Sequence, residues 1–256
     1  MNGADPSLIE LGVLVLAGLG AGFVNAVAGG GSLLTLPALF LTGMDKDVAN
    51  ATNRVGVALQ SYVGVATFEK HDLLERSAVT EVTLPSLVGA VLGAFAATRI
   101  SSEALTPVIL LAMVTMGVLL VWKPSVMVPS QDSAALSLRD RPFSGVLLFL
   151  TGIYGGFLQV GVGFLYLGVL GGMLRYDFVR ANALKLLVIA LYTTAALVIF
   201  VWQGMVLWVP GLALALGTMT GARYGVRFAI GARAGVLRVI VLVMILLTVG
   251  KELFLG

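Results

Sequence analysis

The sequence contains the same unusual pattern twice: an apolar run interrupted by clustered glycines and followed by a short polar patch. The first copy breaks at Gly29-Gly30-Gly31 and reaches its polar patch at Asn50–Arg54, and the second copy occupies residues 152–186. A constant offset of 132 residues aligns the two copies without a gap, pairing Gly29 with Gly161 and Asn50 with Asn182. We interpret the pattern as a duplicated broken-helix unit of a membrane transporter.

The composition supports a membrane protein. Of the 256 residues, 59% are hydrophobic and 11% are charged, whereas about a quarter of the residues of a soluble domain are charged. A chain this apolar cannot hide its surface in a water-soluble core, so we predict a polytopic integral membrane protein of the all-α class. An outer-membrane barrel would alternate apolar and polar residues, and this sequence does not.

Several function classes are excluded by missing residue types. The chain has no cysteine and one histidine, His71, which excludes Cys-ligated metals and a multi-His metal site. No phosphate-binding loop and no nucleophile–base motif is present. We therefore predict no enzyme, no cofactor and no metal. We attribute the net charge of +3 to basic cytoplasmic loops rather than to nucleic acid.

Ten apolar segments follow one another along the chain. They cover residues 8–28, 30–43, 48–68, 78–98, 105–122, 144–159, 161–174, 180–202, 206–228 and 235–255. A full crossing needs about 20 residues, so the two segments that follow the glycine breaks are too short to span alone. The stretch 123–142 is hydrophilic and contains three prolines. We predict a first membrane repeat at 1–122, a linker at 123–142 and a second membrane repeat at 143–256.

Charge and parity give a predicted topology. Ten of the 16 Lys and Arg residues fall in loops on one side of the membrane, and three, Lys46, Arg99 and Lys251, fall on the other. The basic side should be cytoplasmic, which places the linker inside the cell and both termini outside. Each repeat has about five segments, an odd number, so the repeats are inverted, with broken or re-entrant helices at the glycine motifs. Gly89–Gly93 and Gly217–Gly221 are GxxxG pairs that allow close helix packing.

The glycine breaks are the expected substrate site. A broken helix exposes backbone N–H and C=O groups, which are tolerated in a membrane only where they face protein, a cavity or a ligand. Two new helix N-termini suit a small oxyanion; the alternative is that the glycines only permit tight helix crossing. The candidate substrate-binding residues are Asn25, Gly30, Gly31, Ser32, Asn50, Thr52, Asn53, Gln159, Gly161, Gly163, Asn182 and Lys185.

Two cations lie inside apolar segments beside these motifs. Lys185 is a functional candidate because a charge within a membrane is costly, and its alternative role is to reach the interface with its ammonium group. Arg54 is adjacent to Asn53, so about 100° separates them around a helix. Both cannot point straight into one pocket, and we favour Asn53. Asn25 and Gln159 either line the pocket or join helices by hydrogen bonds.

The motifs resemble a known family. The runs GFVNAVAGGGSLLTLPAL and ANATNR in the first half, with GIYGGFLQVGVGFLYLGVL and RANALK in the second, resemble the TauE/SafE family of bacterial-type sulfite exporters and anion permeases. The resemblance extends over essentially the whole chain. Ala51 stands where the family commonly has Gly, and Val162 where it often has a polar residue. The resemblance implies a secondary transporter that exports sulfite or small organosulfonates such as sulfoacetate.

The sequence thus predicts an inner-membrane carrier with a midplane anion site and alternating access. Its expected partners are a small sulfur-containing anion and the lipid bilayer, with no nucleic acid and with a possible homodimer. Three alternatives stay open. The chain could form an anion channel of the same architecture, carry another small carboxylate or sulfonate, or serve as the membrane subunit of a soluble partner. The preferred anion, the coupling ion and the direction of transport are not determined by the sequence.

Overall fold

The computed structural model describes residues 6–27, 29–122 and 135–231, and within these residues the chain forms helices joined by short loops. The helices are α1 (Leu8–Val27), α2 (Ser32–Leu41), α3 (Lys46–Glu69), α4 (Val79–Ala97), α5 (Ser102–Trp122), α6 (Phe143–Phe157), α7 (Val162–Leu167), α8 (Phe178–Trp202) and α9 (Trp208–Gly231). A 3-10 turn, η1 (Arg76–Ala78), precedes α4, and a π-helical stretch, η3 (Gly168–Met173), continues α7. The predicted all-α fold is confirmed.

Each of the first nine predicted segments corresponds to one of these helices. The tenth segment, 235–255, and residues 123–134 of the predicted linker lie outside the described residues. Within the described part of the chain, three helical stretches are long and apolar enough to cross a membrane, at Leu8–Val27, Arg76–Ala97 and Phe178–Trp202. α2, with 10 residues, extends over roughly 15 Å, which is too short to cross.

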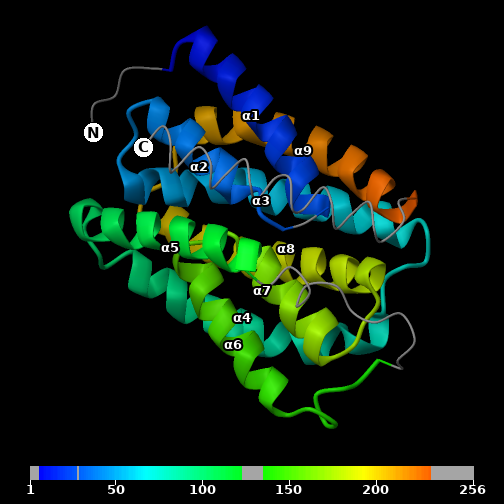
Figure 1. The fold of residues 1–256 in the computed structure, drawn as a ribbon. Helices are drawn as coiled ribbons and strands as arrows, with labels where there is room; N and C mark the ends of the chain where they lie inside the picture. The colour runs from blue at the N-terminus through cyan, green and yellow to red at the C-terminus, as the bar shows by residue number, and fades with distance from the viewer. Residues whose placement is uncertain (1–5, 28, 123–134, 232–256) are drawn as a thin grey trace.

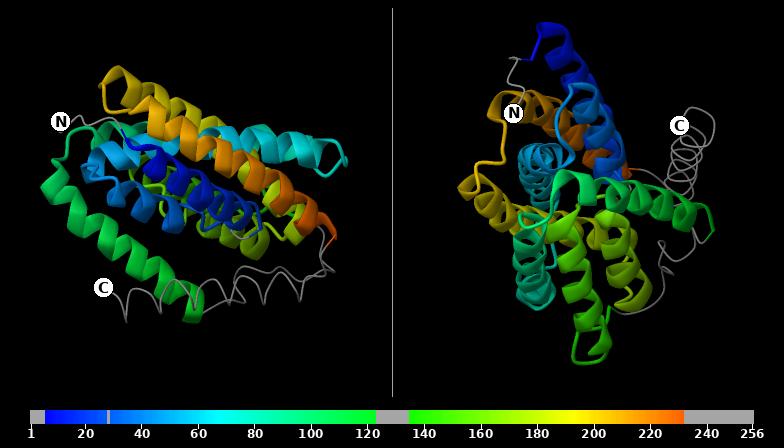
Figure 2. Two further views of the ribbon diagram at one scale, coloured as in Figure 1. Left: turned by 90° about the horizontal axis from the view of Figure 1, so that it is seen from above. Right: turned by 90° about the vertical axis from the view of Figure 1, so that its left-hand side faces the viewer.

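The helices pack in a continuous order that exchanges one element between the two halves of the sequence. α1 packs on α9, α9 on α3, α3 on α8, α8 on α4, and α4 on α6 (Figure 1). α9 therefore joins the first-half helices α1 and α3, while α4 joins the second-half helices α6 and α8. α3 and α8 are the contact between the two groups, and Figure 2 shows the same grouping from two further directions.

Small residues allow the outer pairs of helices to touch at the backbone. A Cβ added to Gly217 or Gly221 of α9 would collide with backbone atoms of Val15 and Leu19 in α1. The predicted GxxxG contact is thus confirmed for this pair. A Cβ on Gly89 or Gly93 of α4 would collide in the same way with α6. Gly and Ala at these crossings bring α1 and α6 close to helices of the other half.

The described end of the linker is attached to the body of the protein. The Leu136 N–H donates to the Leu174 carbonyl at 2.8 Å, and the Leu138 N–H donates to the Glu81 carboxylate of α4. Ser137 donates from its hydroxyl and its N–H to one oxygen of Asp140, at 2.7 and 2.9 Å. These bonds lower the pKa of the Asp140 carboxyl.

Candidate functional site

The two glycine breaks cross each other at the centre of the molecule. Gly29 has φ 98° and Gly161 has φ 62°, conformations in which a side chain would be strained. A Cβ on Gly29 would lie 2.6 Å from the Gly163 carbonyl carbon, and a Cβ on Gly163 would lie 2.5 Å from the Gly29 Cα. Gly30 instead faces the ring of Phe164, with a carbon 2.6 Å from its Cβ position. The predicted glycines are therefore brought together in direct backbone contact.

The C-terminal end of α1, just before the first break, is held by two side chains of α8. Lys185 Nζ donates to the Asn25 carbonyl at 2.8 Å, and Asn182 Nδ2 donates to the Ala26 carbonyl. Both carbonyls lie in the last turn of α1, where an α-helix has no further N–H groups to satisfy them. A cation at this position also interacts favourably with the negative end of the helix dipole.

The C-terminal end of α6, just before the second break, is held by two side chains of α3. Arg54 Nη1 donates to the Gly155 carbonyl at 3.0 Å and Nη2 to the Gly156 carbonyl at 2.6 Å. Asn50 Nδ2 donates to the Phe157 carbonyl at 2.8 Å. Each polar patch therefore satisfies the broken helix of the opposite half of the chain.

The second break also has a strained non-glycine residue. Gln159 has φ 65°, a backbone conformation that costs a non-glycine residue about 1–3 kcal/mol. Its side-chain oxygen accepts from Arg54 Nη1 at 2.9 Å and from the Thr193 hydroxyl at 3.4 Å. The predicted candidate Gln159 thus joins α3, the second break and α8.

The other predicted candidates form a second group around the start of α2. Asn53 Nδ2 donates to the Ser32 hydroxyl at 3.3 Å, and Asn53 Oδ1 accepts from the Thr35 hydroxyl at 2.6 Å. Thr52 instead accepts from the Leu207 N–H at 3.1 Å, just before α9. Gly31 packs against the Ala21 carbonyl and Cβ of Asn25 in α1.

Arg54 and Lys185 are fully buried cations whose hydrogen-bond acceptors are all neutral. Among the described residues, ion pairs form only at exposed positions, joining Arg76 to Glu69 and Arg180 to Glu75 and Asp177. An ion transferred from water into a protein interior without a counter-charge loses several kcal/mol of solvation. The helix ends and the Phe200 ring, 4.7 Å from Arg54 Cζ, offset part of this cost, and an anion would offset more.

The full burial of Arg54 was not foreseen from the sequence, which favoured Asn53 over Arg54 as the residue facing the pocket. That argument assumed that α3 has one inward face. The helix is instead buried on every side from Ala49 to Ala58, so adjacent residues both contact protein. The signal that could have identified Arg54 is the cost of an arginine within an apolar segment.

Several buried polar atoms have no hydrogen-bond partner among the described residues. At the site they are Asn50 Oδ1, Asn182 Oδ1, Arg54 Nε and the hydroxyls of Tyr166 and Tyr192. An unsatisfied buried polar group costs about 1–3 kcal/mol, so a cluster of them suggests a binding function. Within the described residues, His, Asp and Glu form no group of three that could hold a metal ion.

Comparisons with known proteins point in one direction. The family model of the sulfite exporter TauE/SafE matches residues 14–251. The probable membrane transporter protein YfcA of Escherichia coli (strain K12) is 25% identical over 248 residues, which are 97% of this chain and 91% of that protein. The probable membrane transporter protein ORF9 of Sinorhizobium sp is 26% identical, over 91% of this chain and 88% of its own. A probable membrane transporter protein of Haemophilus influenzae is 23% identical, over 98% and 97%. No solved structure matched.

Proposed function

The chain belongs to the sulfite exporter TauE/SafE family of membrane transporters, and from this premise we propose that it exports a small sulfur oxyanion or organosulfonate. Sulfite and sulfoacetate are the intended examples. Its relatives carry only the name of probable membrane transporters, so the substrate is part of the proposal. The binding site lies between the crossed glycine breaks and the two buried cations.

The observation that carries the anionic substrate is the pair Arg54 and Lys185, two fully buried cations with neutral acceptors. A lysine ammonium has three N–H donors, and one of those of Lys185 is used in a described hydrogen bond, to the Asn25 carbonyl. The other two are available to the anionic head. Binding an anion here restores part of the solvation that the two charges lost.

We further propose that the two halves form an inverted repeat. The contacts between α1 and α9 recur between α6 and α4. Gly18 and Gly22 approach Leu214 and Thr218, while Gly152 and Gly156 approach Ser86 and Ala90. Residue numbers differ by 134 between the glycine pairs and by 128 between their partners. Such a constant relation supports two similar units that rock about the crossed breaks to give alternating access.

The proposed orientation places the linker in the cytoplasm and both termini outside, in the inner membrane. It rests on the distribution of Lys and Arg between the loops. Transport then needs no nucleotide, because the negative interior of the cell itself favours the expulsion of an anion. A homodimer is part of the same proposal and rests on the small-residue helix faces.

The decisive variant is Lys185→Ala. Thermal melting of the purified protein in detergent, with sulfite, sulfate, sulfoacetate, taurine, acetate and chloride, identifies the anion, because a bound ligand raises the melting temperature. We expect sulfite or sulfoacetate to stabilise the wild type, and Lys185→Ala to weaken that ligand at least about tenfold. Uptake of the same anion into proteoliposomes should fall in parallel.

The matched control is Lys70→Ala, which removes an exposed lysine just after α3 and should leave both readouts unchanged. If none of the anions stabilises the wild type, the anion site is wrong. If an anion binds the wild type and Lys185→Ala equally well, the role of Lys185 is wrong and the ammonium only caps α1.

A further inference from the structure

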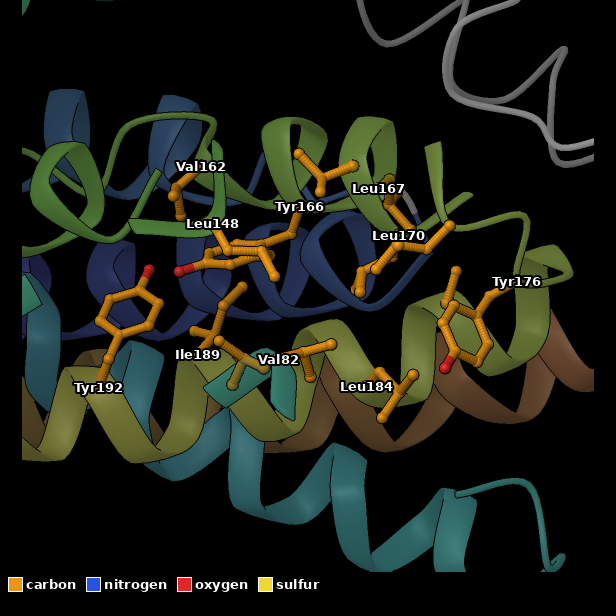
Figure 3. Close-up of a cluster of buried hydrophobic side chains, with 14 of the residues drawn as sticks. Val82, Leu148, Val162, Tyr166, Leu167, Leu170, Tyr176, Leu184, Ile189 and Tyr192 are labelled. Carbon is orange, nitrogen blue, oxygen red and sulfur yellow. The ribbon is translucent and has the colours of Figure 1, made fainter. Parts of the chain in front are cut away.

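Two buried tyrosines lie beside the second break with unused hydroxyl groups. The rings of Tyr166 in α7 and Tyr192 in α8 are stacked, with centroids 5.9 Å apart and planes inclined by 26°. Both residues are fully buried, and neither hydroxyl has a hydrogen-bond partner among the described residues. Figure 3 shows the two hydroxyls pointing toward each other within the apolar cluster formed with Leu148, Val162 and Ile189.

The Arg54 guanidinium meets this pair at Gly155. The Tyr192 hydroxyl lies 2.8 Å from the Cβ position of Gly155, and the carbonyl of the same glycine accepts from Arg54 Nη1 at 3.0 Å. Thr193, next to Tyr192, shares the Gln159 oxygen with Arg54. The Nε atom of Arg54 has no partner in the described part of the chain. Three unused donors are therefore gathered at one end of α6.

We propose that the hydroxyls of Tyr166 and Tyr192, together with Arg54 Nε, form a subsite that binds the oxygens of an –SO₃⁻ group and selects it over a carboxylate. The proposal rests on the anion transport proposed above. An –SO₃⁻ group offers three acceptor oxygens to three donors, whereas a carboxylate offers two. A tyrosine hydroxyl bound to a charged acceptor forms a stronger hydrogen bond than one bound to a neutral acceptor.

The subsite is present in one half of the molecule only. The positions 132 residues before Tyr166 and Tyr192 are Leu34 and Gln60, and the position 132 residues after Arg54 is Leu186. The duplicated plan therefore provides both helix breaks but gives the first break no tyrosine pair. One –SO₃⁻ group is bound per chain, displaced from the glycine crossing toward α7 and α8.

The competing explanation is that the stacked rings only fill the core. In that case the hydroxyls are unsatisfied and costly, and replacing either tyrosine by phenylalanine stabilises the protein. The two explanations differ in how the substitution changes ligand affinity.

The test uses Tyr166→Phe and Tyr192→Phe in the full-length protein, with methanesulfonate and acetate as probes of equal charge and similar size. Dissociation constants come from melting curves at increasing probe concentration. We expect the wild type to prefer methanesulfonate. Each variant should weaken methanesulfonate about tenfold while changing acetate by less than about threefold.

Two control variants remove tyrosine hydroxyls elsewhere. The Tyr154 hydroxyl donates to the Val160 carbonyl at 2.6 Å, and the exposed Tyr62 hydroxyl bonds to that of Thr194 at 3.0 Å. Tyr154→Phe and Tyr62→Phe should leave the ratio of the two affinities unchanged. A tyrosine ultraviolet difference spectrum of the wild type supplies a measurement without variants, because hydrogen bonding to an anion shifts the phenol absorption.

The outcomes separate this proposal from the proposed function. If methanesulfonate and sulfite stabilise the wild type but both Phe variants bind them unchanged, the subsite is wrong and anion transport stands. An equal loss for methanesulfonate and acetate contradicts the selectivity. If no anion affects the wild-type melting curve or its tyrosine spectrum, the proposed function fails and the subsite fails with it.

Discussion

The two helix breaks are built on one plan but are held by different cations. At the first break, Lys185 makes one described hydrogen bond, to the Asn25 carbonyl near the end of α1. At the second, Arg54 makes three, to two carbonyls of α6 and to the side chain of Gln159. In both cases an asparagine one turn earlier satisfies a further carbonyl.

This difference assigns separate tasks to the two cations. A guanidinium has five donors in a planar fork, so Arg54 can fasten several backbone groups at once. An ammonium is a compact charge on a flexible stem, so Lys185 can turn from one acceptor to another. We infer that the second break is the fixed side of the site and that the first break is the side that responds to the anion.

The largest expected effect is that of Arg54→Ala. The variant leaves the Gly155 and Gly156 carbonyls without their donor and opens a cavity, because Arg54 heads the fully buried side chains by volume. The relief of one buried charge offsets part of the loss. We expect a destabilisation on the order of 3 kcal/mol, measured as a lower melting temperature and less folded protein in the membrane.

Lys185→Ala is the matched variant for this prediction. It removes one hydrogen bond together with a buried charge, so without substrate its melting temperature should equal or exceed that of the wild type. If Lys185→Ala unfolds more readily than Arg54→Ala, the assignment of the fixed and responsive sides is reversed.

The next effect concerns the glycine crossing. Gly163→Ala places a Cβ 2.5 Å from the Gly29 Cα, a backbone contact that only separation of the two breaks can relieve. Gly30→Ala meets the Phe164 ring, a side chain that can rotate. We expect Gly163→Ala to cost about 1–3 kcal/mol and to reduce transport strongly, with Gly30→Ala costing less than about 1 kcal/mol.

The measurements for this pair are the melting temperature and anion flux into proteoliposomes at equal protein content. Equal behaviour of Gly163→Ala and Gly30→Ala would mean that the breaks do not depend on backbone contact with each other.

The positions of the helices could be predicted from the sequence because each apolar run ends at charged residues, glycine or proline. The predicted segment 180–202 became α8, Phe178–Trp202, and Asp177 caps its start through bonds to Val179 and Arg180. The predicted segment 161–174 became α7 followed by η3. Hydropathy carries no information on that change from α to π geometry, because both forms present the same apolar surface.

The exchange of α4 and α9 between the halves could not be predicted, because GxxxG pairs mark a close crossing without naming the partner. The same limit applies to the site. The sequence identified both breaks, Asn50, Asn182 and Lys185, all of which lie together. It did not reveal that each patch holds the break of the other half, since that depends on how the halves cross.

The smallest effect, and the finest test of the comparison, comes from the two asparagines. Asn50→Ala and Asn182→Ala each leave a buried carbonyl, of Phe157 and of Ala26, without its side-chain donor. The three bonds of Arg54 still hold the end of α6 in the first variant, whereas Lys185 alone holds the end of α1 in the second. We expect losses of about 1 kcal/mol for Asn50→Ala and about 2 kcal/mol for Asn182→Ala.

Melting temperatures of both asparagine variants, each with and without the stabilising anion, check this order. Because the first break is the responsive side, the anion should recover more of the loss in Asn182→Ala, by drawing Lys185 and the end of α1 together around its charge. A larger loss in Asn50→Ala, or equal recovery in both variants, would mean that the two breaks share the work of binding and that the choice of Arg or Lys does not divide it.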